Sequence, residues 1–142
     1  VRCAREAAPH MVGQGWGRIV NVSGMAALGA GSVSAGMRNI AIISLSRTLA
    51  QELGPHGITA NTVLPGAVIT EDRAGRLEAL AAQRGVSVAE LDRRDDKRNA
   101  LRRVVAAEEI GMVVAYLCSP LAQTVTGESL SVSGGGSAVI AY

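Results

Sequence analysis

The strongest constraint on the fold of this chain is its alternation of short β-branched segments with longer helical ones. Residues Arg18–Ser23 and Ile58–Leu64 are rich in Val, Ile and Thr, and each is followed by Gly or Pro, which predicts two strands. Ser129–Val132 predicts a third strand before a run of glycines. All three segments have the length of ordinary strands rather than helices.

The segments between these strands have helical character. A leading helix is predicted from Arg2 to about Val12, a second over Met37–Leu53, closed by Gly54, and a third over Ala106–Cys118. Strands that alternate with helices run parallel and are joined by crossovers, with helices covering the sheet. The sequence therefore predicts an α/β fold with three parallel strands flanked by helices.

Composition limits the class of protein. The 142 residues are 48% hydrophobic with a net charge of +2, which suits one domain over residues 1–142 and argues against nucleic acid as a partner. The aromatic residues are Trp16, Tyr116 and Tyr142, too few to stack bases. No apolar stretch reaches the roughly 18 residues of a membrane helix. The start of the chain has no secretory signal, and the thiols of Cys3 and Cys118 are expected to stay unpaired, so we expect a cytoplasmic protein.

One region carries most of the charge. Residues from Glu71 to Arg103 hold 16 of the 26 charged side chains, nine basic and seven acidic. Such a mixed block is typical of a solvated helical excursion. Ser87 and Glu90 have the spacing of a capping box at a helix start within it.

The helix Met37–Leu53 has more apolar surface than one sheet contact needs. One stripe consists of Ile42, Leu45, Leu49 and Leu53, and the other of Ile40, Ile43 and Ala50. The second stripe suggests a subunit contact, and hence a homo-oligomer through this helix. A single wide core face is the equally weighted alternative.

Several segments carry a family resemblance. They are Gly17–Ser23, Leu49–Gly54, Gly57–Asn61, Pro65–Thr70, Glu108–Ile110, Thr126–Gly127 and Gly134–Gly135. In this order they closely resemble the C-terminal half of classical short-chain dehydrogenases/reductases. The resemblance implies the C-terminal part of a doubly wound, Rossmann-like sheet, with NAD or NADP as cofactor and a small-molecule alcohol or carbonyl compound as substrate.

The same resemblance implies an N-terminal half with a glycine-rich phosphate-binding turn, which is not visible in residues 1–142. Without that half the predicted strand Arg18–Ser23 has an unpaired apolar edge. We therefore expect a partial sequence, with a naturally short half-domain as the alternative.

The family's catalytic residues are a Ser, a Tyr and a Lys, with the Lys four residues after the Tyr on one helix. The ammonium group lowers the pKa of the phenol, which exchanges a proton with the substrate oxygen while the Ser orients that oxygen. Matching the run Ile42–Ala50 places the Tyr position on Ala35, the Lys position on Asn39 and the Ser position on Gly24. Standard tyrosine-based catalysis is therefore not expected from this chain.

Possible substitutes are few. Ser23 remains beside the altered Ser position and is the one catalytic candidate, although a hydroxyl that caps the backbone is the favoured alternative. Ser34 and Arg38 are also four residues apart, but they are one position out of register, and a guanidinium group cannot exchange a proton.

The segment Pro65–Thr70 follows the end of a predicted strand, where ligands of open α/β sheets bind. By resemblance, Pro65 and Gly66 belong to a cofactor-binding segment in which the backbone at Val68 meets the nicotinamide carboxamide and the hydroxyl of Thr70 adds a contact. A purely structural turn is the alternative. Asn39 can bind a ribose hydroxyl through its amide. The charged region, about residues 71–103, corresponds to a substrate lid. No metal site is expected, because no histidine or cysteine has ligand spacing.

Three functional hypotheses follow. The first is an oxidoreductase-like member of this family that binds a nicotinamide cofactor but is divergent at its catalytic residues. The second is a non-catalytic binding or regulatory subunit that pairs with a homologue through the helix Met37–Leu53. The third is a truncated product without activity.

Overall fold

The main sheet consists of parallel strands, as the sequence predicts. A computed structural model describes residues 1–29, 31–96 and 99–136 of the chain. Within these residues the sheet has the strand order β1 (Gly17–Val22), β2 (Ile58–Pro65) and β5 (Ser129–Val132). Both pairings are parallel, with Val63 opposite Val22 on one side and Leu130 on the other. The predicted α/β class is confirmed, and each predicted strand end lies within one residue of the observed one.

The central strand β2 is the most deeply buried element. Every residue from Ile58 to Leu64 is buried, because the strand has a neighbour on each side and helices on both faces. Its Asn61 side chain donates to the Val125 carbonyl at 2.7 Å and accepts from the Glu128 amide at 3.1 Å, whereas Thr59 Oγ1 is buried without a partner among the described residues. The edge strand β1 is mostly half-buried.

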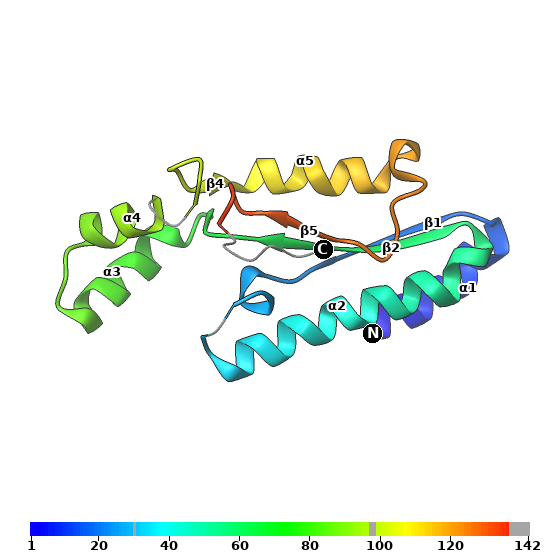
Figure 1. The fold of residues 1–142 in the computed structure, drawn as a ribbon, viewed down its shortest axis with the longest axis horizontal. Helices are drawn as coiled ribbons and strands as arrows, with labels where there is room; N and C mark the ends of the chain where they lie inside the picture. The colour runs from blue at the N-terminus through cyan, green and yellow to red at the C-terminus, as the bar shows by residue number, and fades with distance from the viewer. Residues whose placement is uncertain (30, 97–98, 137–142) are drawn as a thin grey trace.

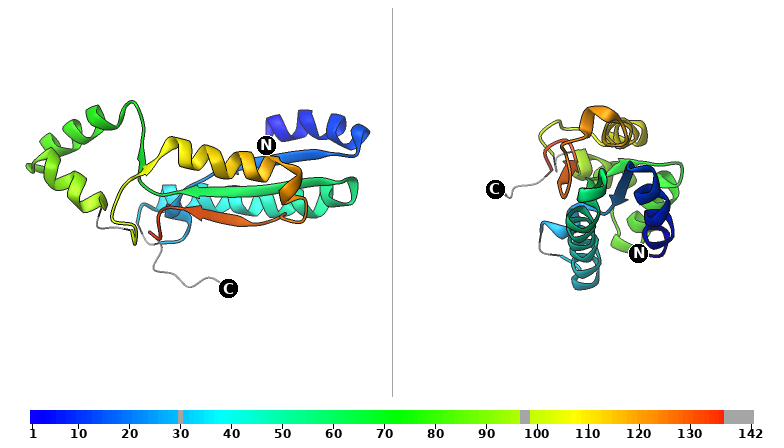
Figure 2. Two further views of the ribbon diagram at one scale, coloured as in Figure 1. Left: turned by 90° about the horizontal axis from the view of Figure 1, so that it is seen from above. Right: turned by 90° about the vertical axis from the view of Figure 1, so that its right-hand side faces the viewer.

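Helices cover both faces of the sheet. The helices α1 (Arg2–Gln14) and α2 (Val33–Leu53) lie on one face and α5 (Ala107–Cys118) lies on the other (Figures 1 and 2). In the core between α5 and the sheet, Leu117 packs with Val63 and Ala122, all of them fully buried. The short 3₁₀ helices are η1 (Met25–Ala27), η2 (Gly54–His56) and η3 (Pro120–Ala122).

The predicted start of the second helix, Met37, is wrong. The helix α2 begins at Val33 because Ser32 caps its N-terminus and accepts a hydrogen bond from the Ala35 amide at 3.4 Å. The capping serine lies in a run of small and polar residues, where the apolar spacing gives no helix signal.

The two apolar stripes of α2 largely share one wide face. Ile42, Ile43, Leu45, Leu49 and Leu53 are half-buried and Ala50 is buried. Ile40 is 55% exposed and continues the exposed apolar positions Val33 and Met37 toward the N-terminus of the helix. The apolar surface that α2 leaves uncovered is therefore its N-terminal part.

The charged region forms two helices that project beyond the end of the sheet (Figures 1 and 2). These are α3 (Arg73–Arg84) and α4 (Val88–Asp96). The Glu90 amide donates to Ser87 Oγ at 3.2 Å, one of the two bonds of the predicted capping box. The excursion leaves and returns through two short parallel strands that the sequence analysis did not predict, β3 (Val68–Ile69) and β4 (Val105–Ala106). Residues 97–98 of the predicted lid lie outside the described residues.

At the opposite end of the molecule, Trp16 directly precedes β1. The Arg18 guanidinium lies 4.8 Å from the centroid of the Trp16 ring, which is a cation–π distance.

Across the described ranges, no helix is long and apolar enough to span a bilayer.

Candidate functional site

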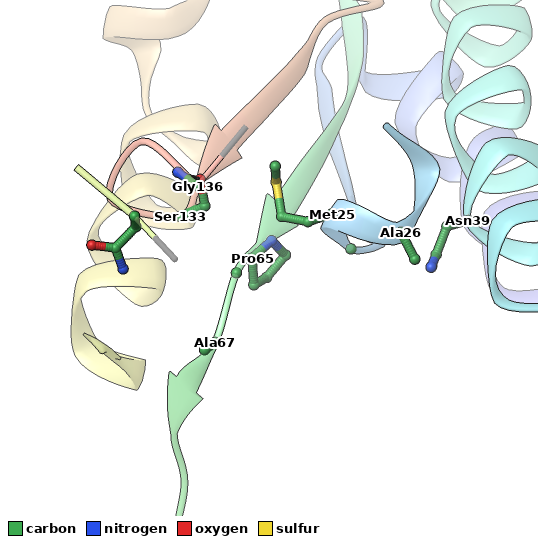
Figure 3. A pocket seen from close by; sticks show the side chains of 10 residues that line it. Met25, Ala26, Asn39, Pro65, Ala67, Ser133 and Gly136 are labelled. Atoms are coloured by element: carbon green, nitrogen blue, oxygen red, sulfur yellow. Dashed lines mark hydrogen bonds between the residues drawn. The ribbon is translucent and has the colours of Figure 1, made fainter. Parts of the chain in front are cut away.

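A pocket of about 360 Å³ lies where β1, β2 and β5 end (Figure 3). Its lining residues are Gly24, Met25, Ala26, Asn39, Pro65, Gly66, Ala67, Asn99, Ser133 and Gly136. The polar side chains among them are two amides and one hydroxyl, and none of the ten ionises near neutral pH. The lining can therefore donate and accept hydrogen bonds but holds no general acid or base.

Ser23 and Asn39 meet at the wall of this pocket. Ser23, at the end of β1, directs its Oγ toward the Asn39 backbone carbonyl at 3.0 Å and toward Asn39 Oδ1 at 3.1 Å. Asn39 is only 8% exposed. The Ser23 hydroxyl is thus engaged with α2, as in the capping alternative.

The positions assigned to the family's Ser and Lys are also neighbours in space. A Cβ atom built on Gly24 would lie 3.7 Å from Asn39 Nδ2, an ordinary contact distance. Ala35, at the Tyr position, is half-buried and does not line this pocket. Ser34 and Arg38 are exposed, and Ser34 Oγ lies 3.1 Å from Ser32 Oγ.

The segment predicted to contact the cofactor is shared by two neighbouring pockets. Pro65 lines the first pocket, whereas Val68 and Thr70 line a second pocket of about 370 Å³ against α3. Gly66 and Ala67 line both. In the second pocket Arg76 Nη2 donates to Thr70 Oγ1 at 2.8 Å, so that the Thr70 hydroxyl keeps its own proton to donate.

Close backbone packing fixes the path of this segment. A Cβ on Gly66 would lie 2.9 Å from the Cβ of Ser133, so only glycine fits there without movement. The Gly66 amide donates to the Val132 carbonyl at 3.3 Å, and the Val105 amide donates to the Ala67 carbonyl at 3.2 Å. The shared wall of the two pockets is therefore tied to β5 and to β4.

Asn99 is a lining residue that the sequence analysis missed. It is 7% exposed, its Nδ2 donates to the Arg103 carbonyl at 2.6 Å, and its Oδ1 is buried without a partner among the residues that the structure describes. Its amide packs against Gly134, where a Cβ would lie 3.1 Å from Asn99 Cγ. Asn99 falls in the charged region that we interpreted as solvated, and no spacing or neighbouring motif distinguishes it there.

The loop after Asn99 ends in a strong ion pair. Arg103 Nη1 and Nη2 each donate to one oxygen of the Glu109 carboxylate at 2.6 Å, and the Ala106 amide donates to the same carboxylate at 2.8 Å. The hydrogen bonds from Arg103 and then from Ala106 lower the pKa of Glu109 to about 2. Glu109 thus caps the start of α5 and anchors the loop that carries Asn99.

Other chemically active residues lie apart from the pocket. Cys3 and Cys118 are exposed free thiols, and His10 and His56 are exposed. Within residues 1–29, 31–96 and 99–136, no group of three His, Cys, Asp or Glu side chains could hold a metal ion. Tyr116 is exposed on α5, and Tyr142 lies outside the described residues.

Known proteins resemble the chain along nearly its whole length. A family model described as enoyl-(acyl carrier protein) reductase matches residues 1–137. The short-chain reductase protein NovJ of Streptomyces niveus is 38% identical over 95% of this chain and 50% of its own length. This chain spans about half the length of such curated relatives.

Solved structures agree in fold. The structure of YwfH, described as an NADPH-dependent reductase involved in bacilysin biosynthesis, superposes with a TM-score of 0.87 at 27% identity, covering 96% of this chain and 53% of that one. A 3-oxoacyl-[acyl-carrier protein] reductase from Brucella melitensis with bound NAD gives a TM-score of 0.75 at 26% identity, with 94% and 45% of the two chains covered.

Proposed function

Because this chain belongs to the short-chain dehydrogenase/reductase family, we propose that it binds a nicotinamide cofactor at the carboxyl ends of its strands. The observation that carries the proposal is the pocket of about 360 Å³, which brings Asn39 to the same cavity as Pro65 and Gly66. These residues come from α2 and from the end of β2, and each is a position that the family resemblance assigns to the cofactor.

The lining fits the nicotinamide end of such a cofactor. Glycine at positions 24, 66 and 136 leaves backbone open along the pocket wall. The Asn39 amide suits a ribose hydroxyl, and the backbone around Val68, in the neighbouring second pocket, suits a carboxamide. The bound cofactor would supply hydride chemistry, while these side chains hold and orient it.

NAD and NADP both remain consistent with the family. YwfH is described as an NADPH-dependent reductase, and the Brucella reductase has NAD bound. We propose a nicotinamide dinucleotide as ligand and a small alcohol or carbonyl compound as substrate, with residues 71–103 as the covering lid.

Exposed unpaired thiols at Cys3 and Cys118 suit the reducing cytoplasm as the location.

The residues at the family's catalytic positions argue against ordinary proton transfer by this chain. The positions of the family's Ser, Tyr and Lys hold Gly24, Ala35 and Asn39, none of which ionises. We therefore propose a cofactor-binding protein in which residues 1–142 do not supply the usual Tyr–Lys acid–base pair. Its catalytic positions have diverged although the cavity persists.

The test is a fluorescence titration of the natural polypeptide that contains residues 1–142 with NADH and with NADPH. We expect saturable binding of at least one of the two, with no turnover of simple ketones. Failure to bind either cofactor would contradict the proposal. Rapid ketone reduction that survives Ser23→Ala would contradict the divergence of the catalytic positions.

A non-catalytic subunit that pairs with a second copy or a homologue is the second candidate function. Val33, Met37 and Ile40 favour it, because they form an apolar strip with i, i+4 and i+7 spacing, and their exposures are 77%, 69% and 55%. Light scattering should show a dimer or larger species that Met37→Glu weakens, whereas Ala82→Glu at an exposed position of α3, away from this strip, should not. A strict monomer, alone and with homologues, would exclude this function.

A truncated product without activity makes a different prediction. Such a chain is expected to be proteolytically labile and to unfold without a sharp transition. Cooperative thermal unfolding of the isolated 142 residues would argue against it.

A further inference from the structure

We propose that Ser23 is a positioning residue, which holds the Asn39 side chain so that its amide nitrogen binds a neutral oxygen acceptor of the ligand. The acceptor is a hydroxyl or carbonyl oxygen. The inference rests on the proposed function for the identity of the ligand, but its structural basis lies entirely in β1 and α2.

The Ser23 hydroxyl fixes the orientation of the Asn39 amide group. It is shared between the Asn39 backbone carbonyl at 3.0 Å and Asn39 Oδ1 at 3.1 Å. Because a hydroxyl has a single proton, this proton is committed to Asn39 and is not available to a substrate. With Oδ1 held on the Ser23 side, the two protons of Nδ2 lie on the other side of the amide group.

That nitrogen is available to a ligand. Asn39 lines the pocket, and Figure 3 shows its side chain extending from α2 with the nitrogen at its tip. Among the described residues no hydrogen bond involves Nδ2, and it is not one of the buried atoms that lack a partner. The neighbouring Gly24 has no side chain to cover it, since even a Cβ there would remain 3.7 Å away.

The chemistry of an amide donor defines the acceptor. An ammonium group at this position would attract anions and titrate, whereas an amide is neutral at every pH that a protein tolerates. The other lining side chains are also uncharged near neutral pH. Because none of the ten lining side chains carries a charge that would offset the desolvation of an anion, a neutral oxygen is the favoured partner of Asn39. The strength of this contact should not change with pH through titration of residue 39. The oxygen comes either from the cofactor ribose or from a substrate carbonyl.

The binding test compares three variants of the natural polypeptide, with NADH as the probe. Ser23→Ala should weaken NADH binding about five-fold, the value of one hydrogen bond. Ser23→Thr keeps the hydroxyl and should restore most of the affinity. Thr48→Ala is the matched control, because it removes an exposed hydroxyl of α2 that donates to the Ser44 carbonyl at 3.1 Å, and it should leave NADH affinity unchanged. Wild-type affinity in Ser23→Ala would overturn the proposal.

Two further probes identify the source of the oxygen. If Ser23→Ala weakens the binding of nicotinamide mononucleotide, which retains the ribose, the acceptor oxygen belongs to the cofactor. A penalty that appears only when ethyl acetoacetate is titrated into the NADH complex assigns it to the substrate carbonyl. If neither probe shows a penalty, Asn39 does not bind a neutral oxygen and the proposal fails.

A readout without cofactor separates this proposal from the proposed function. The ¹⁵N relaxation of the Asn39 side-chain amide should show a rigid group in the wild type and a mobile one in Ser23→Ala, with rigidity regained in Ser23→Thr. An equally rigid amide in Ser23→Ala would overturn the positioning role even if NADH binds. If the wild type binds neither NADH nor NADPH, the cofactor proposal fails while the relaxation data still decide the role of Ser23.

Discussion

Gly24 and Asn39 lie next to each other across the end of β1, where a Cβ on Gly24 would be 3.7 Å from the Asn39 amide nitrogen. Fifteen positions separate them in the sequence, and the family register assigns them to the Ser and to the Lys. A Ser at position 24 and a Lys at position 39 would therefore be close enough to contact one ligand. The contact makes restoration of the catalytic residues a feasible experiment.

The first prediction concerns that restoration. The triple change of Gly24→Ser, Ala35→Tyr and Asn39→Lys should create ketone reductase activity if the pocket still holds cofactor. A positioned acid–base group contributes on the order of 100-fold or more in rate. The measurement is NADPH oxidation in the presence of a panel of ketones. Asn39→Lys alone is the control and should remain inactive, because it lacks the phenol, and a triple variant that binds NADPH without any turnover would contradict the prediction.

The second prediction concerns pH. The folded-state pKa of Glu109 is lowered to about 2 from an ordinary 4.5, chiefly by Arg103. A depressed carboxyl pKa stabilises the fold above the unfolded-state value and loses that contribution as the pH falls toward the folded-state value. The variant Glu109→Gln should be less stable than the wild type at neutral pH, because it lacks this contribution. Between these two pKa values its stability should fall less steeply with decreasing pH than that of the wild type.

Thermal midpoints measured across that acid range provide the comparison for Glu109. The variant Glu108→Gln alters the exposed neighbour on the same turn of α5 and should keep the wild-type pH dependence. Equal slopes for wild type and Glu109→Gln would show that the ion pair contributes nothing to acid sensitivity.

The third prediction concerns the core beneath α5. Leu117 is fully buried against Val63 and Ala122, so that Leu117→Ala should cost about 2–5 kcal/mol of unfolding free energy. Leu121 is 82% exposed, and Leu121→Ala should change stability by less than about 0.5 kcal/mol. Chemical denaturation of both variants tests the difference, and similar losses in the two would show that α5 is not seated as described.

The fourth prediction concerns backbone strain near the pocket. Arg102 has a φ of 55°, a left-handed conformation that costs a side chain about 1–2 kcal/mol. Arg102→Gly removes this cost but adds chain entropy to the unfolded state. The net result should be an increase of about 0.5–1 kcal/mol in the free energy of unfolding. The neighbour Leu101, which is 58% exposed, is the control, since Leu101→Gly relieves no left-handed conformation and should destabilise through added chain entropy and lost side-chain contacts. A lower thermal midpoint for Arg102→Gly would contradict the prediction.

Most of the sheet could be predicted because local and global signals agree. Half of the residues of β2 are β-branched and the strand is buried along nearly its whole length, and Gly54 and Pro55 end the preceding helix where its apolar spacing stops. The start of α2 could not be predicted in the same way, because it depends on a serine cap among small residues rather than on apolar periodicity. The two-residue strands β3 and β4 depend on a pairing between positions 68 and 105, which no local pattern encodes.

The part of the candidate site that follows the end of a strand could be predicted from the sequence. Pro65 ends β2 and Gly66 follows it directly, and both line the pocket, as expected for an open α/β sheet. Asn99 was not predictable, because its burial depends on Gly134, thirty-five residues further along the chain. The bond between Ser23 and Asn39 was not predictable either, since the sequence allowed Ser23 to face a ligand or the backbone.

The position of Trp16 allows its fluorescence to report a ligand bound at the other end of β1. It is the sole tryptophan of the chain and stands just before the strand, whereas Ser23 stands just after it, about 23 Å away at the usual rise per residue. Indole emission overlaps the absorption of a reduced nicotinamide ring. A ligand of that type beside Ser23 would quench Trp16 by energy transfer across the length of the strand, without touching it.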